Sequence, residues 1–365
     1  MRKTDKKPII ILVLAIILLI CFVEYAGILC DTNDIPKGYF RDEIADTVEK
    51  VKKFETEPAL VFLLCSDIHY MSIQGKRLKL DTVTDMTINM AALKKQIHVD
   101  GLICLGDVVD AKSPTKTAET MEQIRYVMRR LKGVDAPLIY CMGNHDDNRY
   151  AKGLDGKAGS EYFTTKQLNS LFMSHTITNK VIDESMDGLN YYVDYDKFKI
   201  RVFVLNSNYQ EINGNQNWKY GFSDNTVTWF KNQMNQVQSG WSVLLLTHRW
   251  YVREDNSKKQ WMKNQQQILN IVNSFISSGG KFIATIYGHS HIDYSQKKTF
   301  LEIAIAAQKC QNLVAKNYWP VGSSAPFREI NTATEDLWDV LIIRPESQTV
   351  NTIRFGAGKD REWTY

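Results

Sequence analysis

The sequence predicts a layered α/β fold. Three short apolar runs, at residues 59–65, 101–105 and 137–141, have the length and composition of buried strands. The stretches between them, at about 80–97 and 117–132, have helical patterns. Because strands that alternate with helices connect through right-handed crossovers, this βαβαβ order predicts strands and helices in separate layers.

The N-terminal segment is predicted to anchor the chain in a membrane. Residues 8–23 carry no charge and are almost all Ile, Leu, Val, Ala or Phe, and the apolar character resumes after Glu24 as far as residue 30. The stretch reaches the length of about 20 residues that a spanning helix needs if Glu24 extends to the interface. Basic residues precede it, so the positive-inside rule places the N-terminus in the cytoplasm and the rest of the chain outside the cell. A cleaved signal peptide is the alternative, but the segment has no small-x-small cleavage site.

A stalk is predicted between this anchor and the globular part of the chain. Apolar residues recur at helical spacing between charges over residues 40–54, and Pro58 ends this amphipathic helix. We expect the helix to pack on the domain rather than on a partner helix or the membrane surface. The predicted division of the chain is a cytoplasmic tip and transmembrane anchor at 1–30, an amphipathic stalk helix at 31–58, and one domain at 59–365.

The second half of the domain contains further predicted strands. Residues 149–190 are polar and irregular, which indicates an insertion or a long loop. Residues 191–195 and 198–206 have the pattern of a hairpin that turns at Asp196-Lys197. Buried strands are expected at 243–246 and 282–286, and a last hairpin at 338–343 and 350–355.

The composition is that of an ordinary globular protein with a sizeable core. Hydrophobic residues make up 44% of the chain and charged residues 24%. The net charge of +4 is small and the basic residues are scattered, so nucleic-acid binding is not expected. The six cysteines lack the spacing of a zinc knuckle or a disulfide scaffold, and we expect free, buried thiols.

Residue types that bind metals follow each of five predicted buried strands. In open α/β sheets a site lies at the carboxyl ends of the strands, so these five ends can converge on one point. A single Asp or Asn after a strand is usually a turn or helix cap, and a single His is usually a packed residue. However, five of the seven histidines fall in these segments, which favours a shared site. The segments are Ser66-Asp67-Ile68-His69, Gly106-Asp107-Val108-Val109-Asp110, Gly143-Asn144-His145-Asp146, Thr247-His248 and Gly288-His289-Ser290-His291.

The side-chain chemistry of these segments predicts two metal ions. Mixed carboxylate, imidazole and amide ligands suit divalent Mn, Fe or Zn, and are too rich in nitrogen for a magnesium or calcium cage. One ion cannot use so many ligands, whereas two ions about 3.5–4 Å apart, bridged by a carboxylate and a hydroxide, would use them all. Gly106, Gly143 and Gly288 are expected to let the backbone turn sharply where a side chain would collide.

In order and spacing, these segments resemble the calcineurin-like metallophosphoesterase superfamily, and in particular a bacterial membrane-anchored member. The resemblance runs from about residue 59 to residue 355. Two shorter segments, Leu205-Asn206-Ser207 and Thr228-Trp229-Phe230, agree with it. It implies that the α/β fold is a four-layer αββα sandwich, here preceded by an N-terminal transmembrane helix.

The resemblance also implies a role for each candidate residue. A hydroxide that bridges the metals would attack phosphorus, and His145, steadied by Asp146, would protonate the leaving oxygen as general acid. The first metal would be bound by Asp67, His69, the bridging Asp107 and His291, and the second by Asp107, Asn144, His248 and His289.

Some positions depart from the family pattern. Asp110 stands where purple acid phosphatases have Tyr, so no tyrosinate-iron site is expected, and Asp110 is either an outer partner of the site or a helix cap. Arg249 follows His248 where many relatives have a second His. With Asn148 and Arg149 it is a candidate for phosphate binding, because guanidinium groups suit phosphate oxygens, and ordinary surface pairing is the alternative.

The predicted function is hydrolysis of phosphodiesters or phosphomonoesters outside the cell, on nucleotides, phospholipid head groups or wall phosphodiesters. A non-catalytic binding or scaffold protein of the same fold is one alternative, although every expected site position is filled. A nuclease is another, although aromatic residues reach only 11% and no Lys/Arg stripe is present. No obligate protein partner is expected. Substrate specificity would come from residues 149–190 and 208–225.

Overall fold

The structure is a computed structural model that describes most of the chain. The described residues are 35–71, 82–112, 115–157, 159–213, 215–250, 262–316 and 319–365. Among them, no helix has both the length and the apolar character to cross a membrane. The anchor predicted before residue 31 lies outside the described residues.

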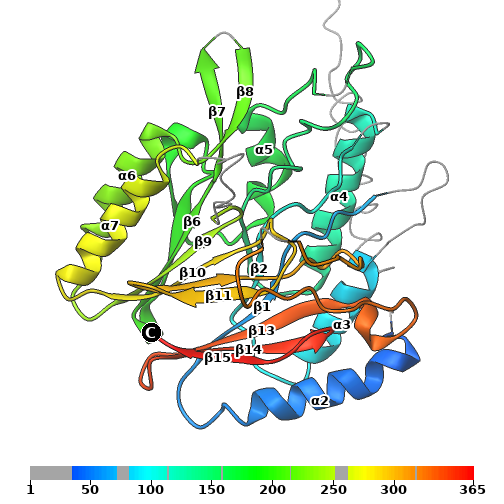
Figure 1. The fold of residues 1–365 in the computed structure, drawn as a ribbon, viewed down its shortest axis with the longest axis vertical. Coiled ribbons are helices and arrows are strands. Elements are labelled where there is room, and N and C mark those ends of the chain that lie inside the picture. The colour runs from blue at the N-terminus through cyan, green and yellow to red at the C-terminus, as the bar shows by residue number, and fades with distance from the viewer. Residues whose placement is uncertain are drawn as a thin grey trace, which may run out of the picture.

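Two β-sheets form the centre of the domain (Figure 1). In the first sheet, β1, β2 and β3 run parallel and β13 pairs antiparallel to β1. Its strands, in spatial order, are β15 (Arg361–Thr364), β14 (Thr349–Gly356), β13 (Leu337–Arg344), β1 (Leu60–Cys65), β2 (Gly101–Cys104) and β3 (Leu138–Tyr140).

The second sheet has four parallel strands at its centre, β12, β10, β9 and β6. In spatial order its strands are β11 (Tyr294–Lys297), β12 (Leu301–Ala304), β10 (Lys281–Tyr287), β9 (Ser242–Thr247), β6 (Ile200–Leu205), β5 (Tyr191–Tyr195) and β4 (Lys180–Ile182). A separate hairpin of β7 (Asn208–Asn213) and β8 (Asn215–Tyr220) extends beyond it (Figure 1).

Alternate residues of the second sheet belong to two different hydrophobic cores. Successive side chains on a strand point to opposite faces, so one strand can serve a core on each side. The side chains that pack with the first sheet include Val202, Val204, Leu244 and Leu246. The side chains that pack with the helices on the opposite face include Phe203, Leu205, Val243 and Leu245.

Helices cover the outer face of each sheet, which completes a mixed α/β sandwich (Figure 1). On α2, Ile44, Val48 and Val51 are buried and the helix contacts β14, as the helical spacing predicted. The helices beside the first sheet are α2 (Arg41–Lys52), α3 (Thr82–Lys94) and α4 (Thr117–Gly133), and those on the second are α6 (Asp224–Met234) and α7 (Gln265–Ser277). Short 3-10 helices occur at Gly38–Phe40, Met173–His175, Glu184–Met186, Asp196–Phe198 and Ala333–Glu335.

The predicted βαβαβ unit and both predicted hairpins are present, but the region 149–190 is more regular than predicted. It contains α5 (Thr165–Leu171) and the edge strand β4, which pairs antiparallel with β5. Val181 and Ile182 on β4 are exposed. Because an exposed edge strand needs no continuous apolar run, its sequence does not stand out from a loop.

Candidate metal centre

The carboxyl ends of strands from both sheets meet at one place. The backbone N–H of His289, after β10, donates to Oδ2 of Asp67, after β1, over 2.8 Å. Across the same junction, Nδ1 of His248, after β9, lies 2.7 Å from the carbonyl oxygen of Leu105, after β2. The residues predicted from five separate segments are therefore neighbours in the fold.

Four side chains form a first candidate site, and they are the four predicted for the first metal. The ligand atoms of Asp67, His69, Asp107 and His291 all lie within 4.8 Å of one another. Nε2 of His69 is 3.0 Å from Nε2 of His291, which in turn is 3.2 Å from Oδ1 of Asp67. Oδ2 of Asp107 is 3.6 Å from Nε2 of His69.

A second group of ligands shares Asp107 with the first. Ligand atoms of Asp107, His248 and His289 also lie within 4.8 Å of one another. Nε2 of His248 is 3.2 Å from Oδ2 of Asp107 and 3.2 Å from Oδ1 of Asn144. Asp107 thus lies between the two groups, at the position that a bridging ligand requires.

The hydrogen-bonding state of these side chains fits divalent cations. Nδ1 of His69 faces the Asp110 carboxylate and Nδ1 of His248 faces a backbone carbonyl. Because these oxygens can only accept, each Nδ1 carries a hydrogen, and in the neutral rings each Nε2 presents a lone pair to the centre. Oδ1 of Asp67 is buried without a hydrogen-bond partner among the described residues. Converging lone pairs and a buried carboxylate oxygen are a typical ligand set for borderline divalent ions.

The electrostatics of the centre favour positive charge. Burial alone would raise the pKa of Asp107, but His248 and His145 hold that pKa well below its usual range. Burial alone would lower the pKa of His69, but the bonds to Asp110 and Asp67 raise it to about 9. The carboxylates therefore stay ionised and favour positive charge, which is a proton on His69 in the metal-free centre and would be a metal cation once one is bound.

Five of the seven predicted ligands have a left-handed backbone, which few residues other than glycine adopt. Such conformations cost on the order of 1–3 kcal/mol each and cluster at functional sites. The surrounding loops therefore hold these side chains in place against local strain. The residues are Asp67 (φ 53°), His69 (φ 49°), Asp107 (φ 53°), His289 (φ 65°) and His291 (φ 59°).

Two of the predicted glycines are needed for close approach rather than for a turn. A Cβ atom on Gly143 would collide with the backbone nitrogen and Oδ1 of Asp107, and one on Gly288 would collide with Oγ of Ser66. Neither glycine has a positive φ. Gly106, in contrast, has φ +94° and does require the backbone freedom of glycine.

His145 lies beside the first group of ligands. Its ring centroid is 4.6 Å from that of His69, and its Nδ1 is 2.7 Å from the carbonyl oxygen of Asp110. Nδ1 therefore carries a hydrogen, and Nε2 is the nitrogen that can take up or release a second proton. Burial lowers the pKa of His145 to about 4, although Asp107 opposes this effect. An anion bound nearby would favour the protonated ring.

Asp146 does not support His145, and that prediction is wrong. Its carboxylate accepts hydrogen bonds from the backbone N–H groups of Asp107, Val108 and Gly143 over 2.8–2.9 Å, and from the hydroxyl of Tyr140. Asp146 therefore joins the loops after β2 and β3, and the carbonyl of Asp110 orients His145 instead. Sequence reasoning missed Tyr140, because a tyrosine inside a buried strand has the appearance of a core residue.

Asp110 is an outer partner of the site rather than a helix cap. Its Oδ1 lies 3.1 Å from Nδ1 of His69, and the nearest helix, α4, begins only at Thr117. On the opposite side of the first group, Gln311 holds Nδ1 of His291 through its side-chain amide. Nothing in the sequence marked Gln311, which lies 20 residues beyond its partner.

Of the three predicted phosphate contacts, Asn148 is a structural residue. It is fully buried, and its side-chain N–H groups donate to Oγ1 of Thr117 and to the carbonyl of Glu161 over 3.0 and 2.7 Å. These bonds tie the loop after β3 to the start of α4. These bonds use both side-chain N–H hydrogens of Asn148, so the structure gives no support to a phosphate contact there.

Arg149 and Arg249 both lie against the ring of Tyr220, at the end of β8. Their guanidinium carbons are 5.4 and 3.8 Å from its centroid. Arg149 also pairs with buried Asp147 through Nε and Nη2, at 2.8 and 2.6 Å. Tyr220 lies 3.2 Å from Tyr150, hydroxyl to hydroxyl, and the Tyr150 ring is 4.5 Å from His145. These four side chains form an arginine–tyrosine cluster beside the candidate metal ligands, and the sequence did not point to its two tyrosines.

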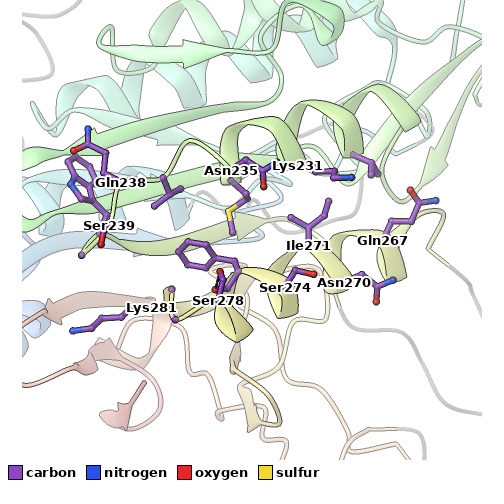
Figure 2. A pocket seen from close by; sticks show the side chains of 18 residues that line it. Lys231, Asn235, Gln238, Ser239, Gln267, Asn270, Ile271, Ser274, Ser278 and Lys281 are labelled. Atoms are coloured by element: carbon purple, nitrogen blue, oxygen red, sulfur yellow. Dashed lines mark hydrogen bonds between the residues drawn. The ribbon is translucent and has the colours of Figure 1, made fainter.

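A groove of about 680 Å³ lies between α6 and α7 (Figure 2), far from the predicted chemistry. It is lined by residues around Trp241 and Lys281, which stand at the amino ends of β9 and β10. Candidate ligands, among them His248 and His289, follow the carboxyl ends of the same strands. The groove contains amide and hydroxyl side chains and two lysines but no acid or histidine, so it lacks the ligand types of the candidate metal centre.

Comparison with known proteins agrees with this geometry. The sequence model of the calcineurin-like phosphoesterase family matches residues 60–293. A dimetal phosphatase from Danio rerio has a similar structure, with a TM-score of 0.58 and 14% identity over 85% of this chain and 100% of that one. A purple acid phosphatase, PPD1, from yellow lupin seeds has a TM-score of 0.52 and 12% identity over 84% of this chain and 54% of that one. No curated protein matches by sequence.

The family match covers more than half of the chain and includes every candidate ligand. Both similar structures share less than 25% identity with the chain, so they bear on the fold alone. The chain therefore belongs to the calcineurin-like phosphoesterase family.

Proposed function

We propose that this chain is a two-metal phosphoesterase in which His145 acts as the general acid. The observation that carries the proposal is the position of Asp107 between two converging ligand groups. A single-metal site would need only one of these groups. The complete set of ligands also argues against a binding protein that has lost its catalytic function.

Two divalent ions held by these residues would neutralise a phosphate and lower the pKa of a bound water. The chain's own residues supply the remaining steps. Nδ1 of His145 is hydrogen-bonded to the backbone carbonyl of Asp110. Nε2 of the same ring can therefore deliver a proton to a leaving oxygen. Asp110 supports this geometry from two atoms, because its carbonyl orients His145 while its carboxylate orients His69.

We assign recognition of the substrate's anionic group to the arginine–tyrosine cluster. Arg249 is only 5% exposed and packs on Tyr220, whose ring is 6.3 Å from that of His289. A guanidinium held on an aromatic ring loses little freedom when it binds phosphate oxygens. The charge of Arg149 is in part offset by Asp147, so Arg249 is the stronger candidate for contact.

We further propose that the domain works outside the cell, attached by an uncleaved N-terminal anchor. The support for this is the apolar sequence of residues 8–30 and the basic residues before it. The divalent ions would be Mn, Fe or Zn, because three of the candidate ligands of the centre are carboxylate or amide oxygens and four are imidazoles.

The function is tested on the full-length, metal-loaded protein with a panel of phosphomonoesters and phosphodiesters. Hydrolysis of at least one class is expected, with loss of activity in a chelator and recovery on addition of Mn²⁺ or Zn²⁺. An Asp46→Asn variant, changed on the exposed side of α2, serves as a control and should behave as the wild type. Metal-loaded protein that hydrolyses none of the panel would argue for a binding protein of this fold.

A further inference from the structure

The loop between β12 and β13 carries an unusual number of exposed apolar side chains. We call the described residues 311–316 and 319–331 the rim loop. Its Val314, Val321, Phe327 and Ile330 are 81%, 100%, 71% and 47% exposed. Exposed apolar residues are normal when they are scattered, but a concentration on one segment indicates a surface that contacts something apolar.

Within the rim loop, Arg328 points inward, whereas Val321 and Phe327 are exposed. Arg328 is only 4% exposed, and its guanidinium donates to the backbone carbonyls of Ala307 and Gln308 over 2.8 and 3.0 Å. It donates also to the carbonyl of Thr334 over 2.8 Å. The interior of the loop is thus filled by a hydrogen-bonded arginine. Val321 and Phe327, in contrast, are exposed on the same loop.

The rim loop is fastened beside the metal centre. Gln311 at its start contacts His291, and the backbone groups of Ser324 pair with those of Asp293 over 2.8 and 2.9 Å. His291, Pro326 and Arg328 line one small pocket. Whatever covers the rim loop therefore lies close to His291 of the candidate metal centre.

The chain enters the domain on this same side. The hydroxyl of Tyr39 donates to Oε2 of Glu335, and the same carboxylate oxygen accepts from the backbone N–H of Asn331 at the end of the rim loop, over 3.2 and 2.8 Å. Residues 31–37 separate the apolar N-terminal segment from the 3-10 helix that begins at Gly38. Seven residues reach at most roughly 25 Å, so an anchor in that segment would hold the rim loop close to a bilayer.

We propose that the rim loop inserts its apolar side chains into the surface of a lipid bilayer, with the candidate active site facing the head groups. Val321 and Phe327 enter the boundary between head groups and acyl chains, where exposed apolar side chains are stabilised. Half-buried Trp319 and exposed Lys316 precede them in the same loop, and both residue types favour membrane interfaces. The inference rests on the proposed N-terminal anchor and does not depend on the proposed reaction.

The test uses the full-length protein in nanodiscs that contain a phosphatidylcholine with a photoreactive group on its head. Mass spectrometry after illumination identifies the labelled peptides. We expect the rim loop to be labelled, and the double variant Val321→Asp with Phe327→Asp to reduce labelling by about tenfold, because less apolar surface enters the bilayer. Both side chains are exposed, so the substitutions should not unfold the domain, and an unchanged melting temperature verifies this.

Val181→Asp is the matched control. Val181 is 45% exposed on β4, at the opposite edge of the second sheet from β11, and β11 adjoins the rim loop. This variant should leave labelling of the rim loop unchanged. The proposal is overturned if peptides around β4 are labelled as strongly as the rim loop. It is also overturned if light scattering in detergent shows that the wild-type protein is a dimer and the double variant a monomer. The rim loop would then contact a second copy of the chain rather than a bilayer.

Discussion

The carboxylate of Asp110 lies 3.1 Å from Nδ1 of His69, and the backbone carbonyl of the same Asp110 lies 2.7 Å from Nδ1 of His145. One residue thus fixes the orientation of a candidate metal ligand and of the candidate general acid. The contact to His69 is made by the side chain of Asp110, and the contact to His145 is made by its main chain. A substitution of Asp110 therefore removes the first contact and keeps the second.

Asp110→Ala should lower metal affinity by about 10–100-fold, as removal of an outer partner of a ligating histidine typically does. The His145 contact should survive, because a backbone carbonyl does not depend on the side chain. Metal titration of the purified variant, followed by calorimetry, measures the change. Asp46→Ala, which removes an exposed carboxylate on α2, is the control. Equal affinities in the two variants would show that Asp110 does not orient His69.

Asp107→Asn should leave at most one tightly bound ion per chain. The substitution keeps the shape of the side chain but removes the charge that both ligand groups share. Elemental analysis of wild-type protein should give two ions per chain, and the variant should also lose activity. A wild-type protein that is fully active with one ion would refute the two-metal centre.

His145→Ala should slow hydrolysis of an alkyl phosphoester by about 10²–10⁴-fold, the usual contribution of general acid catalysis. A p-nitrophenyl ester should be affected much less, because its leaving group departs without a proton. Metal content should not change. His289→Ala provides the contrast, since loss of a candidate ligand should lower metal occupancy and slow both esters alike. Equal slowing of both esters by His145→Ala would instead indicate that His145 only supports the loop.

Tyr140→Phe should destabilise the fold by about 1–3 kcal/mol, because it removes a buried hydrogen bond to the Asp146 carboxylate. Denaturant unfolding of the metal-free protein gives the free energy. Tyr126→Phe, which removes a hydroxyl 2.6 Å from Oγ1 of half-buried Thr84, should cost less because that partner is neutral. If the two variants lose the same stability, Asp146 does not depend on Tyr140.

Protease added to intact cells should remove the domain and leave the N-terminal segment behind, since the positive-inside rule places the domain outside. N-terminal sequencing of the purified protein tests the anchor itself. A chain that begins after residue 23, or a domain that protease cannot reach, would contradict the proposed topology.

The candidate metal ligands could be predicted before the structure because each one lies a few residues after the end of a buried strand. His69 and His291 are separated by more than 200 residues, but each belongs to a short segment whose place in the chain is set by local pattern. The parallel strands then bring these segments to one edge, which is a general property of such sheets.

The supporting residues could not be identified in this way. The hydroxyl of Tyr140 is hydrogen-bonded to Asp146 across the loop after β3. The side chain of Asn148 is hydrogen-bonded to Thr117 and Glu161. Tyr220 reaches the site from a hairpin that sequence reasoning did not find. In each case the residue type allows several roles, and only the partner brought near by the fold selects one.

The sequence by itself determined the alternation of strands and helices along the chain, the family resemblance and the set of candidate ligands, because these depend on apolar periodicity and on short motifs at strand ends. The tertiary structure decided which carboxylate supports which histidine, which arginine lies near the centre, and that the rim loop presents apolar side chains outward. Those features depend on contacts between segments far apart in the chain, and no local pattern encodes the distance between two such side chains.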